Sequence, residues 1–279
     1  MFCLLFASVF CESIVDLVNS NPKATWHAKE YPHLTRARVR SMLGDLDRAT
    51  PKDKYAPSND LPESFDARTQ WGDVILPVRD QESCGGCWAF ATAETAGDRL
   101  GILGCGKGNL SPQDLISCDY LDSGCNGGSS PTAFTYLTYV GITTETCLPY
   151  ASASGIAPSC PTVCNDNSTI IRYKSDSFTY VSATMMQSEL YNNGPFKVGF
   201  YVYDDFYDYE SGIYSSLYGE YLGAHATLLV GWGVENNIPY WTVQNSWGAE
   251  WGESGFFRIV RGTNECNIEG NAWAPYFTC

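Results

Sequence analysis

The sequence lacks two features that define common classes of protein. None of its apolar runs reaches the roughly 18 residues that a membrane-spanning helix needs, so we expect no membrane span. Positive charge is also scarce, because 17 Lys and Arg residues stand against 31 Asp and Glu residues and give a formal net charge of −14. The pI is near 4.5. A nucleic-acid binder needs a basic face to neutralise phosphates, so the composition argues against nucleic acid as a partner.

Histidine is scarce too, and it is unevenly placed. Only one of the three histidines, His225, lies after residue 60. The first 60 residues hold eight basic and seven acidic side chains, whereas residues 61–279 hold nine basic and 24 acidic ones and carry a charge of −15. Such a change in composition is what a separable pro-segment would leave, although an arm joined by a linker would look similar.

Cysteine, by contrast, is abundant. Twelve cysteines in 279 residues favour export, because disulfides persist in oxidising compartments. Apolar residues make up 44% of the chain and aromatic residues 14%, which is enough for a buried core in one or two domains. The apolar run at residues 1–11 predicts a secretory signal, with a buried first helix as the alternative.

The residues after this run predict a small N-terminal unit. Apolar spacing favours two short helices, at 14–19 and 34–46, and the proline-containing stretch 49–62 is typical of an exposed connector that a protease can cut. We therefore divide the chain into a pro-segment, 12–60, and a main body, 61–279. The acidic aromatic run 201–209 is interpreted as a strand and surface loop with solvated carboxylates.

The most informative local pattern surrounds Cys87. An alanine-rich stretch free of proline follows it as far as Leu100 and predicts a buried helix. Two glycines before Cys87 permit a sharp turn that places the thiol at the helix N-terminus, where a thiolate is stabilised. A thiolate can attack a carbonyl carbon. The spacing of Cys84 and Cys87 also fits structural bridges, a zinc site or a redox pair, and these alternatives stay open at this point.

Two further residues supply the groups that a nucleophilic cysteine needs. His225 is predicted to lie at the start of an apolar strand beside a loop, and Asn245 follows a second strand. Cysteine catalysis requires a base to share the thiol proton and a third group to orient that base. A lone histidine at such a place is more often structural than catalytic, and spacing alone does not bring the three residues together.

Four ordered motifs resemble the papain family of cysteine proteases. They are Gln81-x-x-Cys84-Gly85-x-Cys87-Trp88, Cys125-Asn126-Gly127-Gly128, His225-Ala226 and Asn245-Ser246-Trp247-Gly248. The closer resemblance is to cathepsin B-like members, because Leu61 to Arg68 is similar to the start of their mature chain. The resemblance implies an α+β, papain-like two-lobed fold, with a helical left domain, a β-barrel-like right domain and the active-site cleft between them. It also implies that residues 12–60 are an inhibitory propeptide and that 61–279 form the catalytic domain.

The resemblance assigns a role to each candidate site residue. Cys87 is implied to be the nucleophile and His225 its proton partner, with Asn245 orienting the histidine. The side chain of Gln81, together with the backbone N–H of Cys87, is implied to form the oxyanion hole. The remaining candidates are substrate-binding residues, namely Gly127 and Gly128 for the substrate backbone, Trp247 as a cover for the histidine, Trp251 on the primed side and Asn271 at the base of the S2 pocket.

Two departures from the family predict specificity. Only nine residues, 151–159, separate Tyr150 from Cys160, and none is a histidine, so the occluding loop of cathepsin B-like enzymes is expected to be missing. We therefore expect an endopeptidase with little dipeptidyl carboxypeptidase activity. Asn271 is neutral where cathepsin B has an acid, so we expect apolar residues at P2, the second residue on the N-terminal side of the cut, and poor handling of Arg there.

The resemblance also implies a disulfide pattern of Cys84–Cys125, Cys118–Cys160 and Cys147–Cys164, with Cys87 free. Cys105, Cys266 and Cys279 are left over, and a Cys105–Cys279 bridge with Cys266 free is one alternative. Asn109 and Asn167 begin glycosylation sequons, which matter only in the secretory route.

The remaining expectations concern partners and destination. The substrates are expected to be proteins and peptides, with the chain's own propeptide and cystatin-type proteins as inhibitors. We expect a monomer without cofactor or metal, in a lysosome-like vacuole or outside the cell. Two rival functions are a redox protein that uses Cys84 and Cys87, and a secreted binding module without catalysis.

Overall fold

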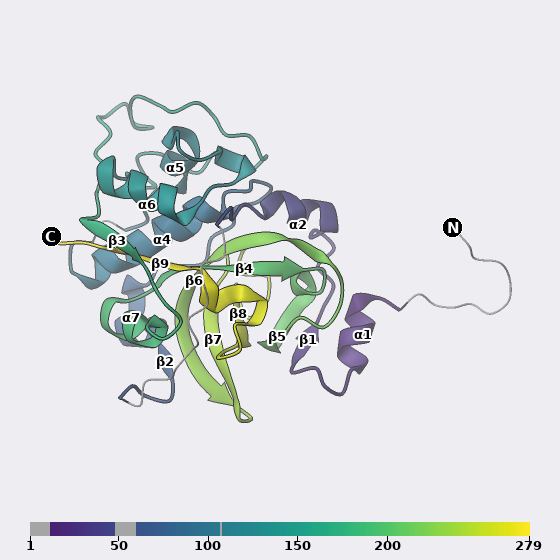
Figure 1. Cartoon of the computed structure of the whole chain (residues 1–279). Coiled ribbons are helices and arrows are strands. Elements are labelled where there is room, and N and C mark those ends of the chain that lie inside the picture. Colours follow the sequence, from purple (N-terminus) through teal and green to yellow (C-terminus); the bar gives the residue numbers. More distant parts are fainter. Residues whose placement is uncertain (1–11, 48–59, 107) are drawn as a thin grey trace, which may run out of the picture.

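The computed structural model describes residues 12–47, 60–106 and 108–279, so the predicted signal segment and most of the predicted connector lie outside the described residues. In Figure 1 the teal helices gather on one side of the molecule and most of the strands lie on the other, with smaller helices beside the strands. Each side has its own hydrophobic core, one around Trp88, Phe90 and Phe134 and one around Phe200, Trp241 and Phe257.

Seven α-helices occur in the described residues. They are α1 Ile14–Ser20, α2 Arg36–Met42, α3 Ala67–Trp71, α4 Cys87–Ile102, α5 Pro112–Cys118, α6 Ser130–Tyr139 and α7 Met186–Asn193. None of the helices in the described ranges is long and apolar enough to cross a membrane.

The described strands form a mixed sheet in the order β1-β5-β8-β7-β6-β4-β9-β3, and β2 pairs with β6. Their bounds are β1 Trp26–Ala28, β2 Phe65–Asp66, β3 Ser177–Tyr180, β4 Phe196–Tyr203, β5 Tyr209–Tyr214, β6 Tyr221–Glu235, β7 Ile238–Gln244, β8 Phe256–Val260 and β9 Ala272–Tyr276. Neighbouring strands are antiparallel except for the parallel pair β5 and β8.

Helix α4 lies between the two sides and is buried from Cys87 to Leu100. It packs against β6 and against α5 and α6. Close packing requires small residues here, since a Cβ on Gly97 would lie 2.6 Å from Leu76 Cδ1. The predicted buried helix is thus confirmed, and it ends at Ile102, two residues later than expected.

The structure contradicts the predicted start of the strand that carries His225. Strand β6 begins at Tyr221 rather than at the histidine. The register continues beyond the histidine because β4 pairs Tyr201 with Ala224 and Val202 with Gly223. His225 therefore lies inside a paired strand, which holds its backbone on both sides.

The structure also contradicts the interpretation of the acidic run at 201–209. Asp205 is fully buried and Asp204 and Asp208 nearly so. The carboxylate of Asp205 accepts hydrogen bonds from the hydroxyl of Tyr214 and the backbone N–H of Leu217. Burial raises the pKa of Asp205 above its ordinary value, while these donors oppose the shift. The run is therefore structural, and its carboxylates are not simply solvated.

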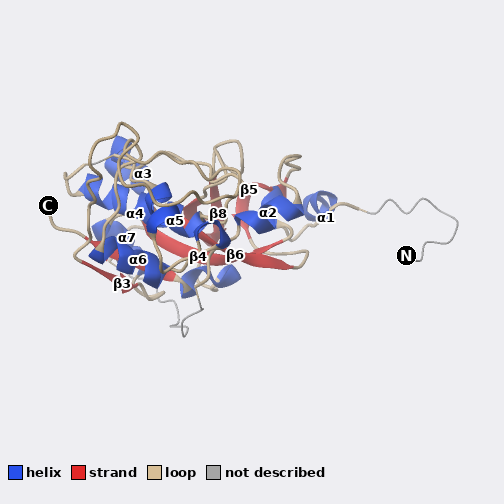
Figure 2. Cartoon of the chain, turned by 90° about the horizontal axis from the view of Figure 1, so that it is seen from above, coloured by secondary structure: helices blue, strands red, loops and turns tan. Residues whose placement is uncertain are grey.

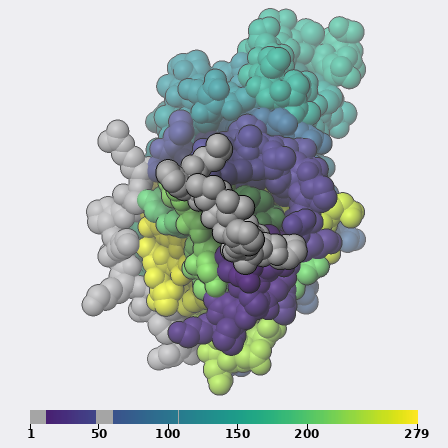
Figure 3. All heavy atoms as spheres, turned by 90° about the vertical axis from the view of Figure 1, so that its right-hand side faces the viewer, coloured from purple at the N-terminus to yellow at the C-terminus, as the bar shows by residue number. Residues whose placement is uncertain are grey.

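Residues 12–47 form a separate layer, called here the N-terminal segment. Ser13 and Asp16 form a capping box at the start of α1, and β1 pairs antiparallel with β5. Helices α1 and α2 lie together at the end of the molecule opposite the C-terminus (Figure 2). In Figure 3 the purple segment crosses the molecule between the teal helical side and the green and yellow strands. The N-terminal segment therefore lies across the junction of the two sides.

Candidate active site

Cys87 opens helix α4 at this junction. Gly86 is the N-cap of the helix, and the side chain of Cys87 packs against Ala226, the residue after His225. The backbone N–H of Gly44, in the N-terminal segment, donates to Cys87 Sγ at 3.3 Å. Complete burial and the negative charge of Asp45 raise the pKa of the Cys87 thiol to about 12, although nearby backbone N–H groups oppose the shift. In this state the thiol keeps its proton at neutral pH.

His225 and Asn245 form a buried pair. His225 Nε2 and Asn245 Oδ1 are 2.7 Å apart. Because the amide oxygen only accepts, the neutral ring donates from Nε2 and leaves the lone pair of Nδ1 free to accept a proton. No protein group bonds the buried Nδ1 in the described part of the chain. Burial lowers the pKa of His225 to about 4, although the hydrogen bond that its ring donates to Asn245 opposes the shift, so the ring is neutral here.

The ring of Trp247 covers this pair, with its centroid 5.0 Å from that of His225. Trp251 lies behind it, 5.2 Å from Trp247 between ring centroids. Trp251 is fully buried, and its indole N–H donates to the carbonyl of Tyr207. The two tryptophans therefore shield the histidine from water on one side.

Gln81 points its amide at the N-terminal segment. Its Nε2 donates to the carbonyl oxygens of Met42 and Cys84, at 2.8 Å each. The hydroxyl of Ser246 donates to Gln81 Oε1 at 2.6 Å, which turns the NH₂ group of Gln81 toward those carbonyls. Ser246 follows Asn245 directly, so one short stretch of chain orients both His225 and Gln81. Sequence reasoning had not given Ser246 a role, although it lies within the quoted Asn245 to Gly248 motif.

Gly127 and Gly128 hold the backbone of the N-terminal segment. The N–H of Gly128 donates to the carbonyl of Gly44, and the N–H of Leu46 donates to the carbonyl of Gly128, both at 2.9 Å. Gly127 has φ +110, in the region that favours glycine, and a Cβ there would lie 2.9 Å from the carbonyl oxygen of Gly44. These glycines therefore allow an extended chain to pass close to the helical side.

Asn271 contacts the N-terminal segment through the side chain of Asp45 and lies next to a buried lysine. Its Nδ2 donates to Asp45 Oδ2 at 3.0 Å, and Lys197 Nζ donates to its Oδ1 at 3.2 Å. Burial lowers the pKa of Lys197, but the charges of Asp45 and Asp47 outweigh this and hold the pKa above its ordinary value. Lys197 was not among the residues predicted for the site, although a lysine inside the apolar run of β4 is a visible signal.

The structure contains the disulfides Cys84–Cys125, Cys118–Cys160 and Cys147–Cys164. It also contains Cys105–Cys279. Cys87 and Cys266 are free. Because Cys84 is bonded to Cys125, it does not offer Cys87 the free thiol that a redox pair of these two residues would need.

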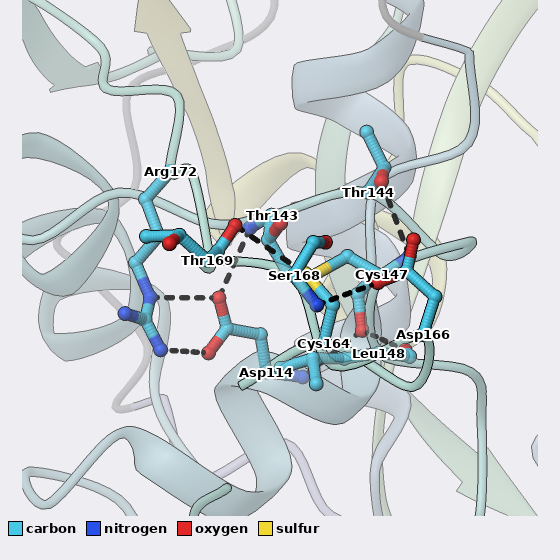
Figure 4. The surroundings of a disulfide bond; sticks show 11 residues. Asp114, Thr143, Thr144, Cys147, Leu148, Cys164, Asp166, Ser168, Thr169 and Arg172 are labelled. Atoms are coloured by element: carbon cyan, nitrogen blue, oxygen red, sulfur yellow. Dashed lines mark hydrogen bonds and ion pairs between the residues drawn. A yellow bond between two sulfur atoms is a disulfide. The ribbon is translucent and has the colours of Figure 1, made fainter. Parts of the chain in front are cut away.

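The Cys147–Cys164 bond closes a short loop near Asp114 and Arg172, which form a two-pronged ion pair with distances of 2.9 and 2.7 Å (Figure 4). From Tyr150 the chain passes close to the site, since the N–H of Ser83 donates to the carbonyl of Ala153. Of the two sequon asparagines, Asn167 is exposed and Asn109 is half-buried.

Comparisons with known proteins agree with this geometry. The family model described as "Papain family cysteine protease" matches residues 61–276. "Cathepsin B-like CP2" of Giardia intestinalis is 39% identical over 274 residues, which cover 92% of this chain and 90% of the relative. "Cathepsin B-like cysteine proteinase 3" of Caenorhabditis elegans is 36% identical, covering 94% of this chain and 81% of the relative.

A solved structure, "proCathepsin B S9 from Trypanosoma congolense", superposes with a TM-score of 0.86 at 32% identity and covers 98% of this chain and 100% of that one. The papain-like α+β fold expected from the motifs is confirmed by this match. The chain belongs to the papain family of cysteine proteases and is a cathepsin B-like, cysteine-type peptidase.

Proposed function

We propose that this chain is a secreted or vacuolar cysteine endopeptidase, made as a proenzyme, that cleaves proteins and peptides through a thioester at Cys87. The observation that carries the proposal is the packing of Cys87 against Ala226, the residue after His225, together with the bond that orients His225 toward Asn245. The Gln81 amide bonds the carbonyl of Cys84 in the turn before α4. Residues 61–279 act as the catalytic domain. Its disulfides and the proposed signal at residues 1–11 support passage through the secretory pathway, where Asn167 and Asn109 are glycosylation candidates.

The proposed reaction uses only side chains and water. Cys87 Sγ attacks the scissile carbonyl carbon as its proton passes to Nδ1 of His225, and negative charge develops on the carbonyl oxygen. The Gln81 Nε2–H and the backbone N–H of Cys87 stabilise that oxyanion. His225 then gives the proton to the leaving amine, which leaves an acyl thioester. A water molecule deprotonated by His225 hydrolyses the thioester, releases the carboxylic acid and restores the thiol.

Residues 12–60 are proposed to keep the enzyme inactive. Within the described part of this stretch, the N-terminal segment occupies the groups that a substrate needs: the thiol contacts Gly44, the Gln81 amide bonds Met42, and Gly128 bonds Gly44 and Leu46. The bridge between Asp45 and Gly128 is parallel, which supports a segment that lies in the cleft in the reverse direction to a substrate. Cleavage in the connector and release of the segment would then open the site.

Labelling of the thiol tests this proposal. In enzyme freed from residues 12–60, an epoxide or iodoacetamide is expected to label one cysteine, Cys87, stoichiometrically, and His225→Ala is expected to abolish the fast phase because the thiol loses its base. The second free thiol is the matched control. Burial raises the pKa of Cys266 well above its ordinary value, so Cys266→Ser should leave the labelling unchanged. Peptide mapping that found the label on Cys266, or on no cysteine, would refute the proposal.

The composition of residues 151–159 gives a second prediction. The loop 151–159 contains no histidine to hold a substrate's C-terminal carboxylate, so peptides with an amidated C-terminus should be cleaved at rates comparable to those with a free carboxylate. Mass spectrometry of paired peptides measures this. Rapid release of C-terminal dipeptides from the free peptides, with weak cleavage of the amidated ones, would show dipeptidyl carboxypeptidase activity instead.

A further inference from the structure

The N-terminal segment places a carboxylate, not an apolar side chain, in the pocket expected to receive P2. Gly44 lies against the thiol, and the next residue, Asp45, bridges Gly128 through its backbone. The side chain of Asp45 enters the pocket at Asn271 and is fully buried. Asp45 thus occupies the place that the resemblance assigns to a substrate's P2 residue.

The pocket is built to receive an anion. Lys197 Nζ donates to Asp45 Oδ2 at 3.1 Å and to Asp47 Oδ2 at 2.6 Å. Asn271 adds a second donor to the same oxygen of Asp45, and it is held in that orientation because its own oxygen accepts from Lys197. Residue 199 is glycine, which leaves room for the carboxylate. Any other residue there would place its Cβ 2.1 Å from Asp45 Oδ2.

Release of the N-terminal segment would remove most of the hydrogen-bond partners of Lys197. Its side chain is 1% exposed, and two of the three oxygens that it bonds belong to the segment. Once they leave, the oxygen of Asn271 is the remaining acceptor among the described hydrogen bonds of Lys197. An ammonium group in a pocket with one neutral acceptor lacks a compensating charge, so an incoming carboxylate gains a charge-assisted hydrogen bond that an apolar side chain does not.

We propose that the S2 pocket selects substrates with Asp or Glu at P2, through Lys197 and the amide of Asn271. The inference rests on the proposed function, because P2 is defined by cleavage at Cys87. It replaces the expectation of an apolar P2 residue, because that expectation considered Asn271 alone, whereas Lys197 donates a hydrogen bond to Asn271 in the same pocket. Exposed charges more than a Debye length from the pocket are screened by salt, whereas Lys197 is proposed to contact the P2 side chain directly.

Matched peptides that differ only at P2 test the proposal with the processed enzyme. Asp is expected to exceed its isostere Asn by at least about tenfold in kcat/KM, since a hydrogen bond to a charged group is worth that factor or more. Arg is expected to be the poorest residue. In Lys197→Met the Asp-to-Asn ratio should fall to about one or below while Leu improves, and Lys197→Glu should favour Arg over Asp.

Lys174→Met is the control, because it removes the same charge from an exposed lysine whose ammonium group donates to the carbonyl of Tyr139. Ratios within one enzyme preparation do not depend on how much of a variant folds, and the wild-type series alone already decides between Asp and Leu. A preference for Leu, or an Asp-to-Asn ratio that Lys197→Met leaves unchanged, would overturn the inference.

Failure of the proposed function is recognised separately. If the processed enzyme cleaves none of the peptides, the peptidase assignment to Cys87 fails, and the affinities of the same peptides for a processed Cys87→Ala chain then decide the S2 question. Tighter binding of the Asp peptide than of the Asn peptide, lost in Lys197→Met, would still support the pocket. Equal affinities would overturn it.

Discussion

The substitution Gly44→Ala is expected to weaken inhibition of the processed enzyme by residues 12–60 about a hundredfold. A Cβ on residue 44 would lie 1.9 Å from the carbonyl oxygen of Gly85, and that oxygen belongs to the turn before Cys87, so it is backbone that cannot rotate away. The segment would have to lift, which breaks the bonds from Gly44 N–H to the thiol and from Gly128 N–H to Gly44. Two hydrogen bonds and the steric strain together are worth about 3 kcal/mol, or roughly a hundredfold in affinity.

The measurement is the inhibition constant of a peptide spanning residues 12–60 against the processed enzyme. Ala37→Val in the same peptide is the control, because it adds methyl groups to an exposed position of α2. Equal inhibition by the wild-type and Gly44→Ala peptides would mean that the segment does not act by lying over Cys87. In the full-length chain the same substitution should give activity before the connector is cut.

The importance of Gly44 could not be predicted from the sequence. The candidate residues of the site were accessible from the sequence because Cys87, His225, Asn245 and Gln81 all lie in recognisable motifs. The helix after Cys87 follows from its alanines. Gly44, by contrast, lies in no motif. Its importance comes from a contact with Gly85, 41 residues away, and only the folded chain defines that contact.

The two local errors have a similar cause. The start of β6 is set by pairing with β4, so residues 221–224, a short Tyr-Leu-Gly-Ala stretch that contains a glycine, become strand although their own pattern does not indicate it. The burial of Asp205 depends on donors from Tyr214 and Leu217 that the local charge pattern does not reveal. Lys197 was missed for the complementary reason: its partners Asp45 and Asp47 are about 150 residues distant in the sequence.

The protonation of Cys87 and His225, the proposed catalytic pair, is expected to change when the N-terminal segment leaves. With the segment in place, burial holds the pKa of the Cys87 thiol at about 12 and that of His225 at about 4. Between these values both groups are neutral, so at neutral pH the thiolate is a very minor form. Release lets water reach both groups and removes the charge of Asp45, which lowers the pKa of the thiol and raises that of the imidazole. A proton can then pass from Cys87 to His225.

The pH dependence of alkylation measures this change. In the unprocessed chain the rate of iodoacetamide labelling at Cys87 should rise tenfold per pH unit through the alkaline range, because only the thiolate reacts and its pKa lies above that range. In the processed enzyme the rate should reach a plateau near neutral pH and exceed that of the unprocessed chain by at least about a thousandfold there. The slope separates protonation from mere obstruction, since a covered thiolate would react slowly but with a plateau at the same pH as the processed enzyme. A plateau at the same pH would show that Cys87 and His225 are not both neutral in the unprocessed chain. In the processed enzyme, His225→Ala should move the plateau to higher pH, because the thiolate loses the imidazolium that stabilises it.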